Sequence, residues 1–554
     1  MGVALVGPLT WLIALPLLGA AAAAAVGRDR ERALRMVGLV TSGLVFAIAA
    51  LVWGRFAPGA ASLQFEEHAP WVPGVGLVYH LGVDGLSVSL VALTALLFPL
   101  ALGAAAQQVK GRAQGFVITA LLLEAGMLGT FLAQDLVLFY VFWEGMLIPM
   151  YFLIGLWGGP GRAPAAMKFL LYTMAGSALM LVALVAVAFA GERIAGRFTF
   201  DLPALLARPL GLGGPYETVL FLAFAAAFAI KMPVWPLHTW LPDAYAEAPP
   251  VVTVLLASVM AKAGAYGLLR FCLPLFPEAM RAFGPLLSIL AVIGILYGGA
   301  IAWAQGDMRR LLAYGSMSHM GFILLGIFAL NVPALQGSLI QMINHGISTG
   351  ALFLIAGMLI ARTGRADTDG YGGAAARAPT LAAAAMIVAL SSLALPGTNG
   401  FIGEFLILLG TFQARPAAAV LAAFGVVAAA AYLLAFIGRI FHGPVRDGLA
   451  SMADLRREEL AILVPLIAVI FWVGLYPRPL LARSEATVRA LLANAAASAA
   501  PAPARHGRDA AASQGAHPAA RQDRRAPALY RAHPAGGEAG SARGGAAAGG
   551  GTSP

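Results

Sequence analysis

The sequence predicts an all-α, polytopic membrane protein with about fourteen transmembrane helices. Of its 554 residues, 60% are hydrophobic and only 11% are charged, whereas about a quarter of the residues of a soluble domain are charged. The apolar residues form repeated blocks of about twenty, the length that a helix needs to cross a bilayer. These two observations exclude a water-soluble fold.

The expected spans begin close to the amino terminus and continue almost to residue 480. The first is not expected to be a signal peptide, because its arginines follow the apolar stretch instead of preceding it. The spans cover roughly residues 3–25, 33–54, 80–106, 113–133, 136–157, 166–190, 217–241, 249–273, 284–304, 309–330, 335–361, 378–412, 417–441 and 459–477.

Two of these spans are interrupted. Pro233 and Pro236 fall in span seven, and the run Leu395-Pro396-Gly397-Thr398-Asn399-Gly400 falls within span twelve. Proline removes a backbone donor and breaks a helix, and broken backbone at membrane depth is tolerated only inside protein or beside a watery cavity. In transporters such breaks recur at matching places in two repeats and indicate an ion path.

Both breaks fall in the fourth span of a block of five, which predicts two inverted five-helix repeats. The last segment is rich in Ala, Gly, Pro and Arg and is expected to be disordered. The expected organisation is residues 1–112 for helices 1–3, 113–273 for the first repeat, 284–441 for the second, 442–494 for helix 14 and its flank, and 495–554 for the tail.

Positive charges lie mainly in the loops after odd-numbered spans, for example at Arg28, Arg162, Arg309 and Arg362. The positive-inside rule assigns those loops to the cytoplasm and both termini to the opposite side. The net charge of +10 lies in these loops and in the tail, which argues against nucleic-acid binding.

The chain has one cysteine, Cys272, which excludes a disulfide framework and an iron–sulfur cluster ligated by this chain alone. The sequence has neither a glycine-rich phosphate loop nor a dinucleotide motif. Any redox cofactor is therefore expected on other subunits.

Lysine is rare among the basic residues and occurs only at Lys110, Lys168, Lys231 and Lys262. Lys231 and Lys262 lie inside spans seven and eight, where a charged group is costly and usually functional. Lysine can lose its proton, whereas arginine cannot. We expect both to carry protons, and the alternative is a structural ion pair between helices.

Other ionisable residues lie within the spans. Glu144 in span five is expected to pair with Lys231, and a permanent buried pair is the alternative. His319 and His345, in spans ten and eleven, fit a proton relay better than a metal site, because no cysteine or carboxylate is near them in sequence. Glu404 follows the break in span twelve and ends the line of charges.

Three further residues have less defined roles. Glu124 is a buried acid in span four, His238 lies at the break of span seven and either gates water or makes a structural hydrogen bond, and Asp84 is expected to cap span three. Five ionisable residues lie near the centres of five different spans, namely Glu144, Lys231, Lys262, His319 and His345. A lateral polar line, parallel to the membrane plane, is therefore expected instead of a vertical pore.

Four motifs lie around these residues: Phe142-Trp143-Glu144, Lys231-Met232-Pro233, His238-Thr239-Trp240-Leu241-Pro242-Asp243-Ala244 and Gly400-Phe401-Ile402-Gly403-Glu404-Phe405. They resemble the antiporter-like membrane subunits of respiratory complex I, and the resemblance covers roughly residues 70–480. Three features resemble the M-type branch (chain 4): the Glu247-Ala248-Pro249 run, the residues around Lys262, and glutamate instead of lysine at position 404. Pro249-Pro250-Val251-Val252 departs from the family pattern.

The resemblance implies roles for these residues. Glu144 and Lys231 would form a half-channel pair, Lys262 the central carrier, His319 and His345 the connecting relay, and Glu404 the step towards the outer side. It also implies a bacterial inner membrane location, L-type and N-type antiporter-like subunits as neighbours, and FMN, iron–sulfur clusters and quinone on partner subunits.

Three other functions stay open from the sequence. They are a D-type subunit of a multi-subunit Na⁺/H⁺ antiporter, a membrane subunit of an energy-converting hydrogenase, and a structural spacer. A spacer would gain nothing from burying titratable groups.

Overall fold

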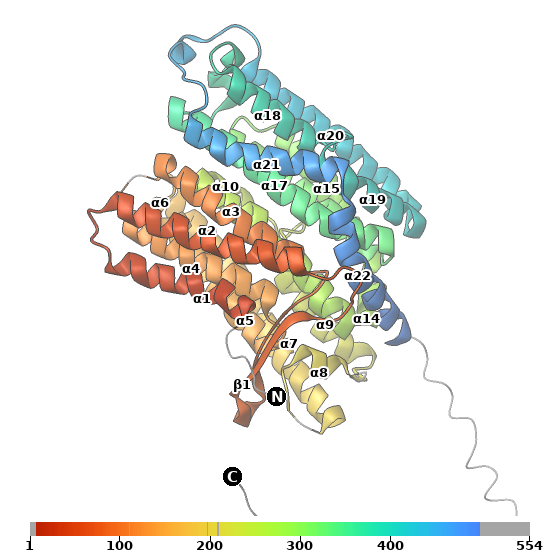
Figure 1. Cartoon of the computed structure of the whole chain (residues 1–554). Coiled ribbons are helices and arrows are strands. Elements are labelled where there is room, and N and C mark those ends of the chain that lie inside the picture. Colours follow the sequence, from red (N-terminus) through yellow and green to blue (C-terminus); the bar gives the residue numbers. More distant parts are fainter. Residues whose placement is uncertain (1–6, 110, 197, 208–209, 499–554) are drawn as a thin grey trace, which may run out of the picture. The chain divides into compact units, whose positions relative to one another are not determined.

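The computed structural model describes residues 7–109, 111–196, 198–207 and 210–498 (Figure 1). Lys110 and residues 499–554, which make up most of the expected tail, lie outside the described residues. The segment up to Ala500 forms one compact unit.

Within the described residues, 13 helical segments are long and apolar enough to cross a membrane. Span twelve is divided into the shorter helices α18 (Pro379–Ser392) and α19 (Asn399–Ala414), which accounts for the fourteenth expected span. The others are α1 (Pro8–Ala25), α2 (Glu31–Arg55), α3 (Val88–Gln108), α4 (Ala113–Leu132), α5 (Leu136–Gly145) with α6 (Leu147–Trp157), α7 (Arg162–Ala195), α9 (Gly214–Lys231), α11 to α13 (Pro250–Leu275), α15 (Gly284–Trp303), α16 (Met308–Phe328), α17 (Val332–Thr363), α20 (Pro416–Phe441) and α21 (Arg457–Leu475).

Three spans form the centre of this unit. In the segment α11 to α13, all of the most apolar window is buried within the chain, and in α16 and α17 the buried share is 94%. The buried share of the outer helices α1 and α2 is below half, which leaves apolar side chains on their outer surface. The central spans contain Lys262, His319 and His345, so these residues lie away from lipid.

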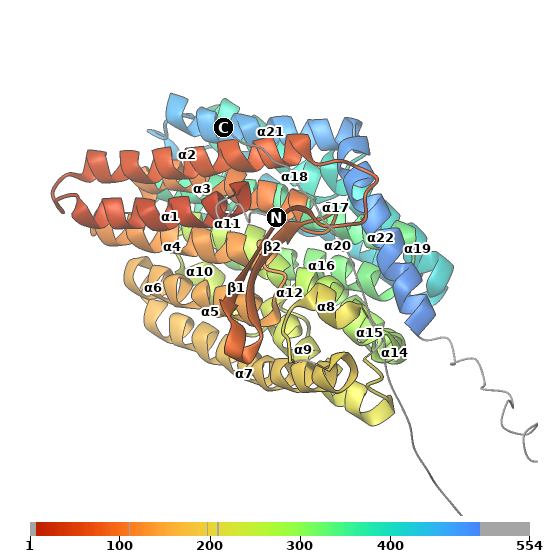
Figure 2. The ribbon, with the colours of Figure 1, turned by 60° about the horizontal axis from the view of Figure 1, so that its bottom comes forward.

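The chain between α2 and α3 forms a β-hairpin that the sequence analysis missed (Figure 2). Strand β1 (Gln64–Val72) pairs antiparallel with β2 (Leu77–Val83). The turn between them ends at Gly76, whose φ of 69° favours glycine. Residues 80–83 therefore belong to β2, and the third span begins at Val88 instead of residue 80. The Pro73-Gly74-Val75-Gly76 run between β-forming residues was the available signal.

Asp84 has a larger role than the expected cap. Its Oδ1 accepts the backbone N–H of Leu86 at 2.9 Å before α3 begins. The same carboxylate binds both terminal nitrogens of Arg270 at 2.6 and 2.8 Å, and both side chains are buried. Arg270 Nε also donates to Tyr266 Oη at 3.0 Å. This bidentate pair joins the start of the third span to the eighth.

Helix breaks occur in three spans. Helix α9 ends at Lys231, and turns lead to the short helix α10 (Leu241–Glu247). Helices α18 and α19 are separated by residues 393–398. The division of α5 from α6 at Met146 was not expected. Pro149 explains it, because a proline ring clashes with the carbonyl four residues earlier, at Gly145.

Further helices lie outside the spans. Helix α8 (Leu202–Leu206) is capped by Asp201, whose carboxylate accepts the N–H of Ala204, and α14 (Pro277–Ala282) precedes α15. Helix α22 (Arg478–Ser498) was not expected, because its Arg, Glu and Ser residues interrupt the apolar ones and leave no apolar block of about twenty residues. Arg483 of α22 lies 3.6 Å from the centre of the Trp53 ring on α2. Helix α22 runs beyond residue 495, where the tail was expected to start.

The Asp84–Arg270 pair gives a test of stability. Replacing Arg270 with alanine leaves a buried carboxylate without a cation, so we expect Arg270→Ala to lower the free energy of unfolding by about 3–5 kcal/mol. Combining Asp84→Leu with Arg270→Met removes both charges and should recover most of that loss. Denaturant unfolding of the chain in detergent, followed by its helical signal, measures both effects.

Arg365→Ala is the control, because the Arg365–Asp367 pair is exposed and exposed pairs contribute little. An unchanged Arg270→Ala variant, or an equal loss in the control, would contradict a structural role for the buried pair.

Candidate functional site

Lys262 lies at the centre of the candidate site on α12 (Ala261–Gly267), and its side chain is completely buried. Its Nζ donates to the carbonyl of Ala257 at 2.6 Å. Five-residue π-helical segments lie on either side, at Leu256–Met260 and Leu268–Cys272. Such bulges often occur at functional sites. Here the first one places a backbone acceptor beside a buried ammonium group.

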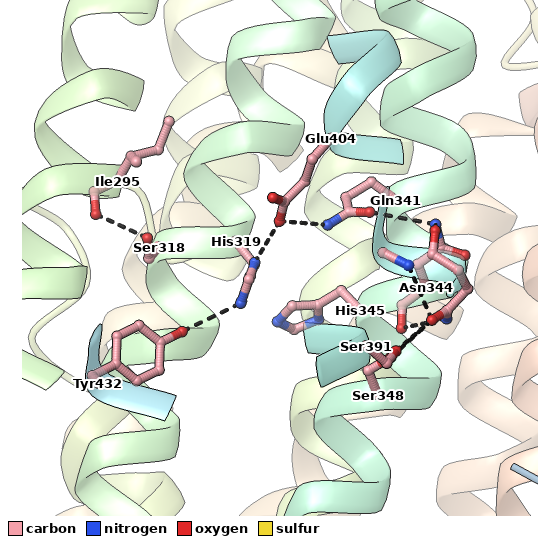
Figure 3. A network of polar contacts seen from close by, with 12 residues as sticks. Ile295, Ser318, His319, Gln341, Asn344, His345, Ser348, Ser391, Glu404 and Tyr432 are labelled. Atoms are coloured by element: carbon pink, nitrogen blue, oxygen red, sulfur yellow. Dashed lines mark hydrogen bonds and ion pairs between the residues drawn. The ribbon is translucent and has the colours of Figure 1, made fainter. Parts of the chain in front are cut away.

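A continuous set of side chains runs from Lys262 to Glu404. Lys262 Nζ contacts His345 Nδ1, and the His345 and His319 rings meet edge to face with their centres 5.7 Å apart. His319 Nδ1 lies 2.9 Å from Glu404 Oε1. Figure 3 shows His319 between Glu404 and Tyr432, with the His345 ring beside it. Residues from α12, α17, α16 and α19 are thus brought into one line.

Glu404 and His319 have further partners. Gln341 Nε2 donates to Glu404 Oε1 at 3.1 Å, and the Tyr432 hydroxyl lies 3.3 Å from His319 Nε2 (Figure 3). Sequence reasoning missed both partners. Gln341 follows the spacing Ser338, Gln341, His345 and Ser348 on one face of α17, and this polar stripe in an apolar span was a usable signal. Tyr432 in α20 gave no comparable signal.

A buried polar network holds the broken twelfth span next to this line. Asn344 Nδ2 donates to the carbonyl of Asn399 at 2.6 Å, and the side chain of Asn399 accepts from Ser391 and Ser348. The end of α18 and the start of α19 are thereby attached to α17. A cavity of about 10 Å³ is lined by residues including His319, His345, Ser391 and Asn344, which is about the room that one water needs.

Glu144 and Lys231 do not form the expected ion pair in this structure. Lys231 is the last residue of α9 and is buried. Its Nζ lies 4.6 Å from the centre of the Trp143 ring. Among the described residues, neither Lys231 Nζ nor Glu144 Oε1 has a hydrogen-bond partner, and no ion pair within 4.0 Å joins the two. Trp143, the neighbour of Glu144 on α5, contacts the lysine instead.

Lys231 and Lys262 lie on helices that pack closely. A Cβ added at Gly264 would meet the carbonyl oxygen of Phe228 at 2.5 Å, so glycine is required for the approach of α12 to α9. This close contact places Lys231 and Lys262 on neighbouring helices.

Two expected residues lie apart from the line. Glu124 on α4 is fully buried and accepts a hydrogen bond from Ser42 of α2 at 2.6 Å, while its Oε1 has no partner within the described residues. His238 lies in the turns after α9, with its ring 5.4 Å from that of Tyr297. No described contact joins either residue to Lys262 or Glu404.

Comparisons with known proteins find relatives that match most of the chain. Residues 133–430 match the family model "NADH:quinone oxidoreductase/Mrp antiporter, TM". NADH-quinone oxidoreductase subunit M of Rhodobacter capsulatus is 44% identical over 84% of this chain and 92% of its own length. The corresponding subunit of Escherichia coli K12 is 40% identical over 87% of this chain and 96% of its own length.

Among solved structures, a chain of respiratory complex I from Thermus thermophilus aligns with a TM-score of 0.78 and 36% identity, covering 88% of this chain and 99% of that one. The chain therefore belongs to the NADH:quinone oxidoreductase/Mrp antiporter membrane-subunit family, in its subunit M branch.

Proposed function

We propose that this chain is a proton-translocating membrane subunit of an NADH:quinone oxidoreductase. The observation that carries the proposal is the line from Lys262 through His345 and His319 to Glu404. Every group in it can bind and release a proton, and the line crosses four helices inside the chain. The names of the relatives support the host complex.

The contacts define how a proton would move. A protonated Lys262 donates to His345 Nδ1 and to the Ala257 carbonyl, which requires a neutral His345 with its proton on Nε2. Transfer from Lys262 to His345 makes an imidazolium whose Nε2, without a described partner, can pass a proton on. One water in the adjacent cavity would bridge the two rings. His319 then donates to Glu404 through Nδ1.

Entry would occur through Glu144 and Lys231. In the arrangement seen here, Lys231 is stabilised by the face of Trp143 and is separate from the carboxylate. Closing the pair would favour both charges, and opening it would favour transfer of the proton towards Lys262. The Glu144–Lys231 pair thus acts as a loading switch whose open state resembles this structure.

The remaining parts of the proposal concern the setting of the chain. FMN, iron–sulfur clusters and quinone reside on partner subunits, and antiporter-like subunits of the L and N types are the membrane neighbours. The chain lies in the bacterial inner membrane with both termini on the periplasmic side, as the loop arginines indicate. Glu404 would then pass protons towards the periplasm.

Variants of Glu144 and Lys231 test whether protons enter through this pair. We expect Glu144→Gln and Lys231→Ala each to lower NADH:quinone turnover and proton pumping by roughly 10²-fold, the lower range for a positioned proton-transfer group, while the complex still assembles. Inverted membrane vesicles allow both rates to be measured.

Glu192→Gln, at an exposed position near the end of α7, is the matched control and should pump normally. Full proton stoichiometry in both loading variants would refute the route. Sodium-dependent proton exchange without NADH would favour the Na⁺/H⁺ antiporter alternative.

Lys262→Arg separates charge from proton release. Arginine keeps the positive charge but cannot be deprotonated, so we expect pumping and coupled turnover to fall by roughly 10²-fold, although the subunit remains in the complex. Lys168→Arg makes the same exchange at a partly exposed lysine that pairs with Asp243 at 2.8 Å, and it should remain active. Pumping at the normal rate in Lys262→Arg would show that Lys262 has only an electrostatic role.

A further inference from the structure

A cluster of metal-binding side chains lies on the β-hairpin, away from the proton line. His68 of β1 and His80 of β2 are directly opposite each other in the antiparallel register. Their rings meet edge to face with centres 4.8 Å apart. His80 is buried, whereas His68 is exposed. Cross-strand neighbours of this kind can bind one ion together, because their Cβ atoms are only about 5 Å apart.

A carboxylate from a distant segment completes the cluster. Asp201, just before α8, places Oδ1 2.6 Å from Nδ1 of His80. One ligand atom from each of His68, His80 and Asp201 lies within 4.8 Å of the others. The second ring nitrogen of His80, Nε2, lies 2.9 Å from Oε1 of Glu66. Both nitrogens of His80 thus face carboxylates.

We propose that His68, His80 and Asp201 bind one divalent transition-metal ion of the zinc class, with Glu66 as the residue that orients His80. Two imidazoles and a carboxylate are a ligand set that Zn²⁺ accepts, with a water in the fourth position. Metal-binding histidines almost always donate their other ring N–H to a carboxylate or carbonyl group, and Glu66 is placed to accept it.

The ligand atoms would have to rearrange on binding. Zinc bonds of about 2.0–2.2 Å place neighbouring ligand atoms roughly 3.4 Å apart. Nδ1 of His80 and Oδ1 of Asp201 lie 2.6 Å apart, so these two atoms would separate slightly to admit the ion, whereas His68 would move towards it. Its side chain is exposed and makes no hydrogen bond to another described residue, which leaves it free to rotate towards the ion.

The alternative arrangement is an ion pair in which a protonated His80 bridges Asp201 and Glu66. The environment of His80 fits that state when no metal is bound. Burial lowers the pKa of His80, but the hydrogen bonds and charges of Asp201 and Glu66 outweigh burial and raise it above its usual value. The ion pair does not involve His68, whereas the metal site does, so this residue distinguishes the two arrangements.

A bound ion would attach the hairpin to two other segments. Asp201 caps α8 and forms an isolated bridge with Asp135. Asp135 accepts the N–H groups of Val137 and Leu138 at the start of α5, the helix that contains Glu144. The ion would therefore fix the hairpin to the start of both helices, and it is expected to be structural because no described contact joins it to the proton line.

The test uses the purified complex, freed of loosely bound metal with EDTA and then dialysed against Zn²⁺. Zinc measured by mass spectrometry should be one equivalent higher in the wild-type complex than in His68→Ala. His442→Ala removes an exposed histidine outside the hairpin and should match the wild type. Equal zinc content in wild type and His68→Ala would overturn the proposal.

Two further measurements keep the test independent of folding and of pumping. Co²⁺ bound in place of Zn²⁺ should give a visible absorption band that His68→Ala lacks. Glu66→Gln should weaken zinc binding by about 10–100-fold, as expected for an orienting carboxylate. Pumping should stay normal in Glu66→Gln, so failure of the metal proposal leaves the proposed function intact. Unchanged zinc affinity in Glu66→Gln would remove the orienting role.

Discussion

The contact between the Lys262 ammonium and His345 is the interaction on which the central architecture depends. An ammonium group buried among apolar spans is stable only with acceptors close by, and Lys262 has two, the His345 ring and the Ala257 carbonyl. The first requires α12 and α17 to lie together, and the second is placed beside a π-helical turn. Helix packing and backbone irregularity therefore both provide contacts for the same buried amino group.

The break in span twelve also depends on buried hydrogen bonds, at the Glu404 end of the set of side chains that starts at Lys262. Span twelve interrupts its backbone where Asn399, Asn344 and Ser391 can satisfy the exposed polar groups. The break ends at residue 398, so the carboxylate of Glu404 enters the protein interior on the second turn of α19 and meets His319. An unbroken helix satisfies its own backbone groups and would not need these polar side chains at membrane depth.

Outside this centre, buried ion pairs and the hairpin connect segments that are distant in sequence. Asp84 and Arg270 join the third and eighth spans, and Asp201 links the hairpin to α8 and to the start of α5. Both connections lie on the side of the chain where α3 begins. The proposed proton line from Lys262 to Glu404 and these structural contacts use different residues, so they can be altered separately.

The sequence by itself determined the number of spans, the two main breaks and the identity of the titratable residues, because span length, proline position and the cost of a buried charge are local properties. It missed the hairpin, α22 and the division at Met146, although Pro73–Gly76 and Pro149 gave signals for the hairpin and the division. Only the tertiary structure decided which groups touch. Lys231 lies against Trp143 without an ion pair to Glu144, and Gln341 and Tyr432 contact Glu404 and His319, because contacts between helices depend on rotation and depth that no single span specifies.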